Sequence, residues 1–233
     1  AISAAIGFVV TYQTGSYTMG FAIAAVAGIC VSLIFALVSI TFLANQVATG
    51  LAVGILSLGI SALIGKKYES LTINAPDTVF IPVLSEIPFI GPVFFQQNIV
   101  VYGAILMAVL IGFCLNKTRL GLAIRACGEN PKAAEALSYS VWKIRYGAVA
   151  FGGMMAGFAG AYASTVYTPL WADGMIAGRG WIAVALVVFG TWKTSRIFLG
   201  AYLFGMVTLG ELVVQSLGFA VPSQFLTAMP FVI

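Results

Sequence analysis

Charge and histidine are what this 233-residue chain has least of. Asp, Glu, Lys and Arg make up 8% of it, whereas a soluble domain carries about 25% charged residues. Histidine is absent, so the sequence lacks the usual proton shuttle and the commonest metal ligand. The three cysteines, Cys30, Cys114 and Cys127, are scattered and give neither a metal-binding spacing nor a disulfide framework. The composition therefore argues against a soluble domain and gives no reason to expect a metal or a cofactor.

Apolar residues take the place of the missing charge. Hydrophobic residues make up 61% of the chain, and its mean hydropathy is +1.06. Because a membrane-spanning helix needs about 20 apolar residues, the sequence predicts an all-α polytopic transmembrane helical bundle forming one domain over residues 1–233. The first residue is Ala and both ends lie in apolar runs, so we expect a fragment. The predicted spans are 1–12 (the tail of a span), 18–40, 44–64, 99–115, 146–166 and 197–217, with another beginning after Pro222.

Two stretches do not fit a simple span. Residues 66–98 contain Pro76, Pro82, Pro88 and Pro92, which exclude a continuous helix and favour an extracytoplasmic segment at the membrane interface or a folded-back plug. Residues 181–192 are too few for a full span and predict a half-helix or an internal packed segment.

The basic residues are concentrated in one polar stretch, 116–145. It holds six of the 11 Lys and Arg residues: Lys117, Arg119, Arg125, Lys132, Lys143 and Arg145. Positive charge marks cytoplasmic loops, so this stretch and residues 193–196 are expected inside, and Lys66 and Lys67 are then a minor exception outside. The net charge of +4 thus indicates topology rather than nucleic-acid binding.

A short helix is predicted within this polar stretch. Asn130 is a good N-cap, and Pro131 suits the first helical position. Residues 132–137 are rich in helix formers. The alternative is an ordinary solvated loop. Because it lies in this basic loop, Cys127 is expected to react with thiol reagents only from the cytoplasmic side.

The same stretch carries a family resemblance. Arg125-Ala-Cys-Gly-Glu-Asn-Pro-Lys-Ala-Ala134 resembles the coupling loop of ATP-binding-cassette (ABC) importer permeases of the branched-chain amino acid, ribose and simple-sugar superfamily. Residues 178–183 (GRGWIA) and 44–46 (ANQ) extend the resemblance, and residues 85–92 (SEIPFIGP) are similar to one permease of the nucleoside and simple-sugar importers. Ser138 stands where this family commonly has Gly.

The resemblance implies a type II-like permease that hydrolyses nothing itself. It implies cytoplasmic ATP-binding subunits, a second permease in a heteromer, an extracytoplasmic solute-binding protein and a lipid bilayer around the complex. Nucleosides or simple sugars are the implied solutes, with ribose-like sugars and branched-chain amino acids as the alternative. The implied ATPase-coupling residues, which meet the partner by charge or fill its groove, are Arg125, Gly128, Glu129, Asn130, Pro131, Ala133, Ala134 and Leu137.

Polar residues inside the predicted spans are candidates for a translocation path. Glu211 is the one carboxylate well inside a predicted span, and Gln215 lies four residues later on the same face. A carboxylate at this depth is costly unless it is paired or hydrated. Asn45 and Gln46 can donate and accept hydrogen bonds to a neutral solute. Interhelical hydrogen bonding or helix capping is the alternative role for both pairs.

A self-sufficient secondary transporter or channel is the competing class. Glu211 would then be a proton or cation site, and residues 181–192 a broken helix. The absence of histidine counts against proton coupling. An intramembrane enzyme is a more distant alternative, because no paired catalytic residues are present.

If Glu211 and Gln215 line the path, Glu211→Gln should change solute uptake and leave protein abundance and association with the ATP-binding subunit unchanged. Transport assays alongside quantitative immunoblots measure this. Unchanged uptake would make the pair structural.

Overall fold

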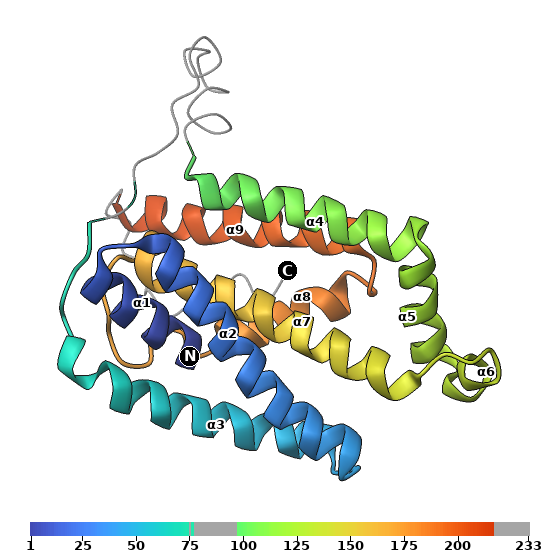
Figure 1. Cartoon of the computed structure of the whole chain (residues 1–233). Coiled ribbons are helices and arrows are strands. Elements are labelled where there is room, and N and C mark those ends of the chain that lie inside the picture. The colour runs from blue at the N-terminus through green and yellow to red at the C-terminus, as the bar shows by residue number, and fades with distance from the viewer. Residues whose placement is uncertain (75, 77–96, 217–233) are drawn as a thin grey trace. The chain divides into compact units, whose positions relative to one another are not determined.

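The computed structural model describes residues 1–74, 76 and 97–216 (Figure 1). The chain divides into two compact units, 1–177 and 178–233, which are described separately. Apart from one isolated bridge between Thr72 and Leu170, all regular structure in the described residues is helical. The predicted all-α class is therefore confirmed.

The first unit contains seven α-helices within its described residues, and two of them end in a π-helical turn. These are α1 (Ile2–Thr14), α2 (Tyr17–Ala36, then the turn Leu37–Thr41), α3 (Gln46–Gly65, then a 3₁₀ turn Lys66–Tyr68), α4 (Ile99–Lys117), α5 (Arg119–Glu129), α6 (Pro131–Ala136) and α7 (Val141–Tyr162, then the turn Ala163–Tyr167). Four of these helices are long and apolar enough to cross a membrane: α2, α3, α4 and α7. They confirm the spans predicted at 18–40, 44–64, 99–115 and 146–166.

The second unit contains α8 (Arg179–Phe189) and α9 (Thr194–Ser216). At 1.5 Å per residue, the 11 residues of α8 extend about 17 Å, roughly half the 30 Å of a hydrocarbon core. The short segment predicted at 181–192 is thus a helix that cannot cross the bilayer alone. Helix α9 occupies the predicted 197–217 span. The span expected after Pro222 and most of the 66–98 segment lie outside the described residues.

Helices α2 and α7 pack with their backbones in direct contact. A Cβ atom added to Gly28 would lie 2.1 Å from the carbonyl oxygen of Gly153, and one added to Gly157 would lie 2.5 Å from that of Ala24. Apolar side chains gain little by leaving lipid for protein, so membrane helices associate largely through close packing of small residues. These glycines therefore allow the tightest helix contact of the first unit, and α7 crosses directly behind α2 in Figure 1.

The predicted extracytoplasmic end is closed around Trp171. Its side chain is 2% exposed and packs on Ala4, Ala5 and Phe8 of α1. A Cβ atom on Gly65, at the end of α3, would overlap the indole ring. The Ser70 N–H donates to the Trp171 carbonyl at 2.9 Å. This end of α3 is therefore fixed to the loop after α7, close to α1.

Gly28→Ala and Gly157→Ala should each destabilise the protein by about 1–3 kcal/mol, because the added methyl group meets backbone that cannot move aside. Thermal unfolding in detergent measures this change. Gly59→Ala is the matched control, since nothing lies within 4 Å of a Cβ there. Equal stability of all three variants would contradict the packing described here.

Candidate ATPase-coupling site and solute pocket

Helices α5 and α6 form a hairpin between the membrane-spanning helices α4 and α7. Thr118 caps α5 by accepting a hydrogen bond from the Gly121 N–H at 3.1 Å. A Cβ atom on Gly121 would lie 2.2 Å from the Cys114 carbonyl oxygen, so this glycine permits the sharp corner between α4 and α5. The chain therefore turns out of the apolar α4 directly into an amphipathic helix.

Helix α6 begins as the sequence predicts. The Asn130 side chain accepts a hydrogen bond from the Ala133 N–H at 3.1 Å, and Pro131 occupies the first helical position. The helix ends where the Tyr139 N–H donates to the Ala134 carbonyl at 3.1 Å. Ser138, at φ 63°, adopts a left-handed conformation that glycine takes at lower cost. This explains why glycine suits the position in the family that the sequence resembles.

A small apolar core holds the hairpin against α7. It consists of Cys127 from α5, Ala134 from α6 and Val141 from α7, with Ile144 packed on it. Cys127 is 2% exposed and Ala134 is 1% exposed. The side from which Cys127 reacts with thiol reagents stays a prediction, and its burial beneath α6 means that labelling should be slow. Ala134 faces inward, so its methyl group orients α6 and is not on the outer surface.

The outer face of the hairpin is exposed and carries unpaired charge. Leu137 is 71% exposed, and Ala133, Gly128, Arg125 and Glu129 are also exposed. Neither Arg125 nor Glu129 forms an ion pair in the part of the chain that the structure describes. An exposed leucine and unpaired charges of both signs on one short hairpin have the character of a protein-docking surface.

The first turns of α7 connect the hairpin to the end of α2. The rings of Trp142 and Tyr146 are in contact, tilted by 35° with their centroids 4.3 Å apart, an aromatic pair typical of a membrane interface. The Tyr146 hydroxyl shares a 2.6 Å hydrogen bond with the Thr41 hydroxyl. Thr41 ends the π-helical turn after α2, and Leu43, two residues later, has a left-handed φ of 53°.

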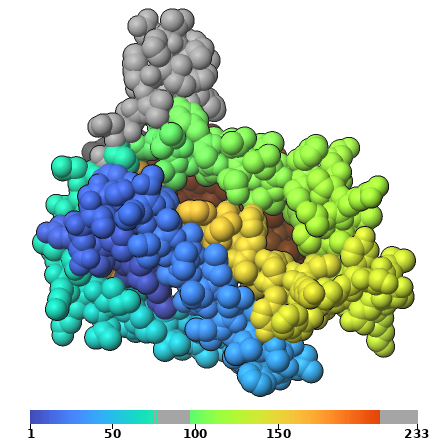
Figure 2. Space-filling model, viewed as in Figure 1, coloured from blue at the N-terminus to red at the C-terminus, as the bar shows by residue number. Residues whose placement is uncertain are grey.

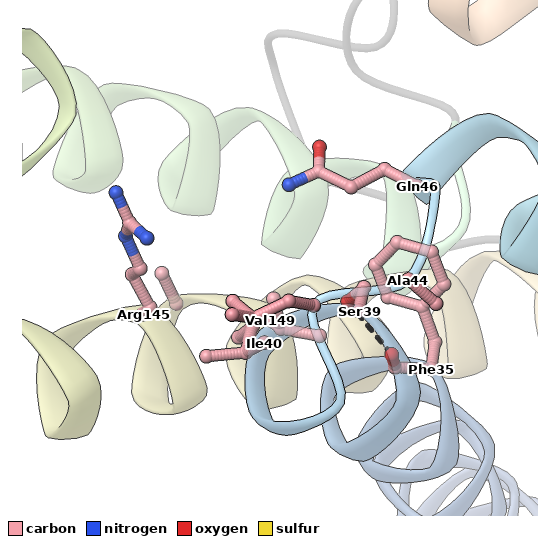
Figure 3. Close-up of a pocket in the computed structure, with 9 residues that line it drawn as sticks. Phe35, Ser39, Ile40, Ala44, Gln46, Arg145 and Val149 are labelled. Carbon is pink, nitrogen blue, oxygen red and sulfur yellow. Dashed lines mark hydrogen bonds between the residues drawn. The ribbon is translucent and has the colours of Figure 1, made fainter.

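A pocket of about 490 Å³ opens between α2, the start of α3 and α7 (Figure 3). Arg145 and Gln46 lie on its two sides in Figure 3: the Gln46 side chain extends toward the side of Arg145, and the Arg145 guanidinium points away from Ile40 and Val149, which also line the pocket. Phe35 and Ser39 form its end on α2. The pocket therefore joins one cation and one amide to apolar walls.

Asn45 and Gln46 have different positions at this pocket. The Asn45 side chain caps α3, accepting from the Val47 N–H at 2.9 Å and the Ala48 N–H at 3.2 Å. Gln46 lines the pocket. Glu211 and Gln215 lie on α9, in the second unit, and their side chains are outside the described residues. The structure thus brings Gln46 together with Arg145, a residue that the sequence analysis counted only as topological charge.

Among the described residues, no group of three His, Cys, Asp or Glu side chains could hold a metal ion. The pocket instead offers a ligand hydrogen bonds from Gln46, stacking on Phe35 and the positive charge of Arg145.

The helices define a multi-pass membrane protein with an amphipathic hairpin between two of its membrane-spanning helices. The family model described as "Branched-chain amino acid transport system / permease component" matches residues 1–233, so the chain belongs to that family. This confirms the resemblance on which the sequence analysis relied.

Curated relatives agree with the family. The chain is 39% identical over 218 residues to TsgC13 of Haloferax volcanii, a permease protein named for glucose ABC transport, covering 92% of this chain and 66% of that protein. It is 32% identical over 215 residues to the nucleoside ABC transporter permease protein NupC of Lactococcus lactis subsp. cremoris, covering 89% and 68% of the two chains. The guanosine ABC transporter permease protein NupQ of Bacillus subtilis is 37% identical over 188 residues, covering 77% and 58%. The chain thus spans 58–68% of the length of these relatives. No solved structure matches it.

Proposed function

We propose that the protein is the permease subunit of an ABC importer and conducts a nucleoside or a simple sugar. The names of the relatives supply the solute class: one is named for glucose, one for nucleosides and one for guanosine. The pocket chemistry agrees, since an amide, a hydroxyl and an aromatic ring suit a neutral solute with hydroxyl groups. Ribose-like sugars and branched-chain amino acids are the alternative solutes.

The α5–α6 hairpin is the docking element for a cytoplasmic ATP-binding subunit in this proposal. The observation that carries it is the outer face, on which Leu137 is 71% exposed and Arg125 and Glu129 are exposed without ion pairs. A helix that presents an apolar residue flanked by charges fits helix-in-groove recognition. Ala133 and Leu137 enter the groove, and Gly128, Asn130, Pro131 and the buried Ala134 hold α6 at the required angle.

The remaining partners follow from the class of transporter. Two ATP-binding subunits drive alternating access, an extracytoplasmic solute-binding protein delivers the solute, and a second, related permease completes the path as a heteromer. The inner end of the path in this chain passes Gln46, and Asn45 fixes that residue by capping α3. Glu211 and Gln215 are proposed to line the path elsewhere.

Charge reversal combined with loss of the helix cap tests the docking role. Asn130→Ala removes a cap worth about 1 kcal/mol of helix stability. Glu129→Lys opposes the charge expected on the partner, and like-charge juxtaposition costs several kcal/mol of association. The double variant should remain in the membrane but lose ATP-driven uptake and release the ATP-binding subunit during purification.

Glu69→Lys is the matched control. It makes the same charge change at an exposed residue just after the far end of α3, so co-purification of the ATP-binding subunit should be normal. Normal co-purification and normal ATP-driven uptake in the double variant would refute the docking role. Solute flux that persists without any ATP-binding subunit would instead indicate a secondary transporter or channel.

A further inference from the structure

A second pocket, of about 250 Å³, lies deeper along α3 than the pocket that contains Gln46. Four helices line it, and α1 contributes the first residues of the sequence. The lining includes Ala1, Ile2 and Ser3 at the start of α1, Val31 and Ser32 of α2, Val53 and Ser57 of α3, and Gly153 of α7. Three serines, one each from α1, α2 and α3, thus line this cavity, and the Ser32 hydroxyl donates a hydrogen bond to the Ile29 carbonyl at 2.8 Å. In Figure 2 the surface is indented where the blue of α2 and the cyan of α3 part.

The two pockets lie along one side of the same helix. Gln46 lines the first pocket, and Gly50, Val53 and Ser57 line the second. These residues follow one another at intervals of four, three and four positions, the spacing of a single helical face. From Gln46 to Ser57 the face extends about 16 Å, half of a 30 Å hydrocarbon core. The two pockets, together called the lane below, share Phe35 and follow this face of α3 from its N-terminal end.

Helix α3 leaves room for this lane because it is fixed mainly at its other end. Its buried residues near the C-terminal end are Ser61 and Gly65, and Gly65 lies against Trp171. Along its whole length it has little contact with α2, and Thr49 is its one buried residue before Ser61. Helices α2 and α3 therefore diverge, and small residues of α3 lie on the side that faces α2.

Phe35 separates the two halves of the lane. It is the one residue that lines both pockets among those that the structure describes. Its ring carbon Cε2 would lie 3.8 Å from a Cβ atom on Gly50 across the gap, so the ring reaches α3 where α3 has no side chain. Phe35 is half-buried in the last turn of α2, and its carbonyl accepts a 2.8 Å hydrogen bond from the Ser39 hydroxyl.

We propose that this lane is the inner half of the solute path and that the Phe35 ring is its gate. The proposal rests on the permease function proposed above and adds the residues that the solute meets. The ring offers a face for stacking on a nucleobase or on the C–H face of a sugar. Serine hydroxyls and the Gln46 amide offer hydrogen bonds on either side. The lane contains no carboxylate, and Arg145 stands at its mouth, so it suits neutral rather than cationic solutes.

Cysteine labelling in the complete permease tests the lane. Ser57→Cys is compared with Leu58→Cys, its neighbour, which is 41% exposed but lines neither pocket. Both are made in a Cys30→Ala, Cys114→Ala background, because these two cysteines lie in membrane-spanning helices. The probe is a charged, membrane-impermeant methanethiosulfonate added from the cytoplasmic side of inside-out vesicles. A thiolate forms only where water reaches the sulfur.

Ser57→Cys should be labelled at least tenfold faster than Leu58→Cys, and adding Phe35→Ala should accelerate labelling at Ser57→Cys further. Phe21→Ala, on the same helix but outside both pockets, should leave the rate unchanged. Labelling of Ser57→Cys should also block ATP-driven uptake. Equal labelling rates at the two cysteines, or no change with Phe35→Ala, would overturn the lane and gate.

Uptake by the unmodified permease, assembled with its ATP-binding and solute-binding partners, is measured separately with radiolabelled guanosine and glucose. If uptake is normal while Ser57→Cys is not labelled, the lane is not the solute path, and the proposed permease function stands. If neither solute is taken up, the proposed solute class is wrong, whatever the labelling result.

Discussion

The arrangement of the first unit depends on the contact between the backbones of α2 and α7. Gly28 and Gly153 leave no room for a Cβ atom between them, and Gly157 meets Ala24 in the same way. Within lipid this close approach supplies packing that apolar side chains alone do not. It also aligns the two helices so that the end of α2 lies beside the start of α7. The hydrogen bond between Thr41 and Tyr146 is a direct consequence.

That alignment connects the hairpin to the pocket by a short route. Cys127 and Ala134 pack on Val141, so α6 and the first turn of α7 form one small body. Tyr146 joins this body to Thr41, and the four residues 42–45 then lead to Gln46. In the proposed transporter, a displacement of α6 by its partner reaches the mouth of the pocket through one core and one hydrogen bond. The left-handed Leu43 marks the loop as a place of backbone strain.

Local chemistry in the sequence was enough to predict the membrane-spanning helices and the start of α6. Long apolar runs define spans without reference to tertiary structure, and Asn130 followed by Pro131 specifies a helix start by its own hydrogen bonding. The polarity of the stretch around Cys127 suggested exposure. Its burial depends on α6 folding back over α5, which residue types alone do not reveal.

The pockets could not be predicted from the sequence either, because they also depend on how the helices pack. Phe35 looks like any aromatic residue of a membrane helix, and Ser57 like any small one. Only the divergence of α3 from α2 brings them to one cavity. Asn45 and Gln46 are both predicted path residues because each can donate and accept hydrogen bonds, but the Asn45 side chain caps α3 and Gln46 lines the pocket. Arg145 was counted as charge, since its place opposite Gln46 follows from the packing of α7 on α2.

Photo-crosslinking from Leu137 tests the central claim most directly. A photoreactive side chain at this position, which is 71% exposed, is activated in the assembled transporter, with Leu63, which is 76% exposed on α3, as the reference position. The account predicts a covalent adduct with the ATP-binding subunit from Leu137 and none from Leu63. An intact complex in which Leu137 gives no adduct with that subunit would contradict it.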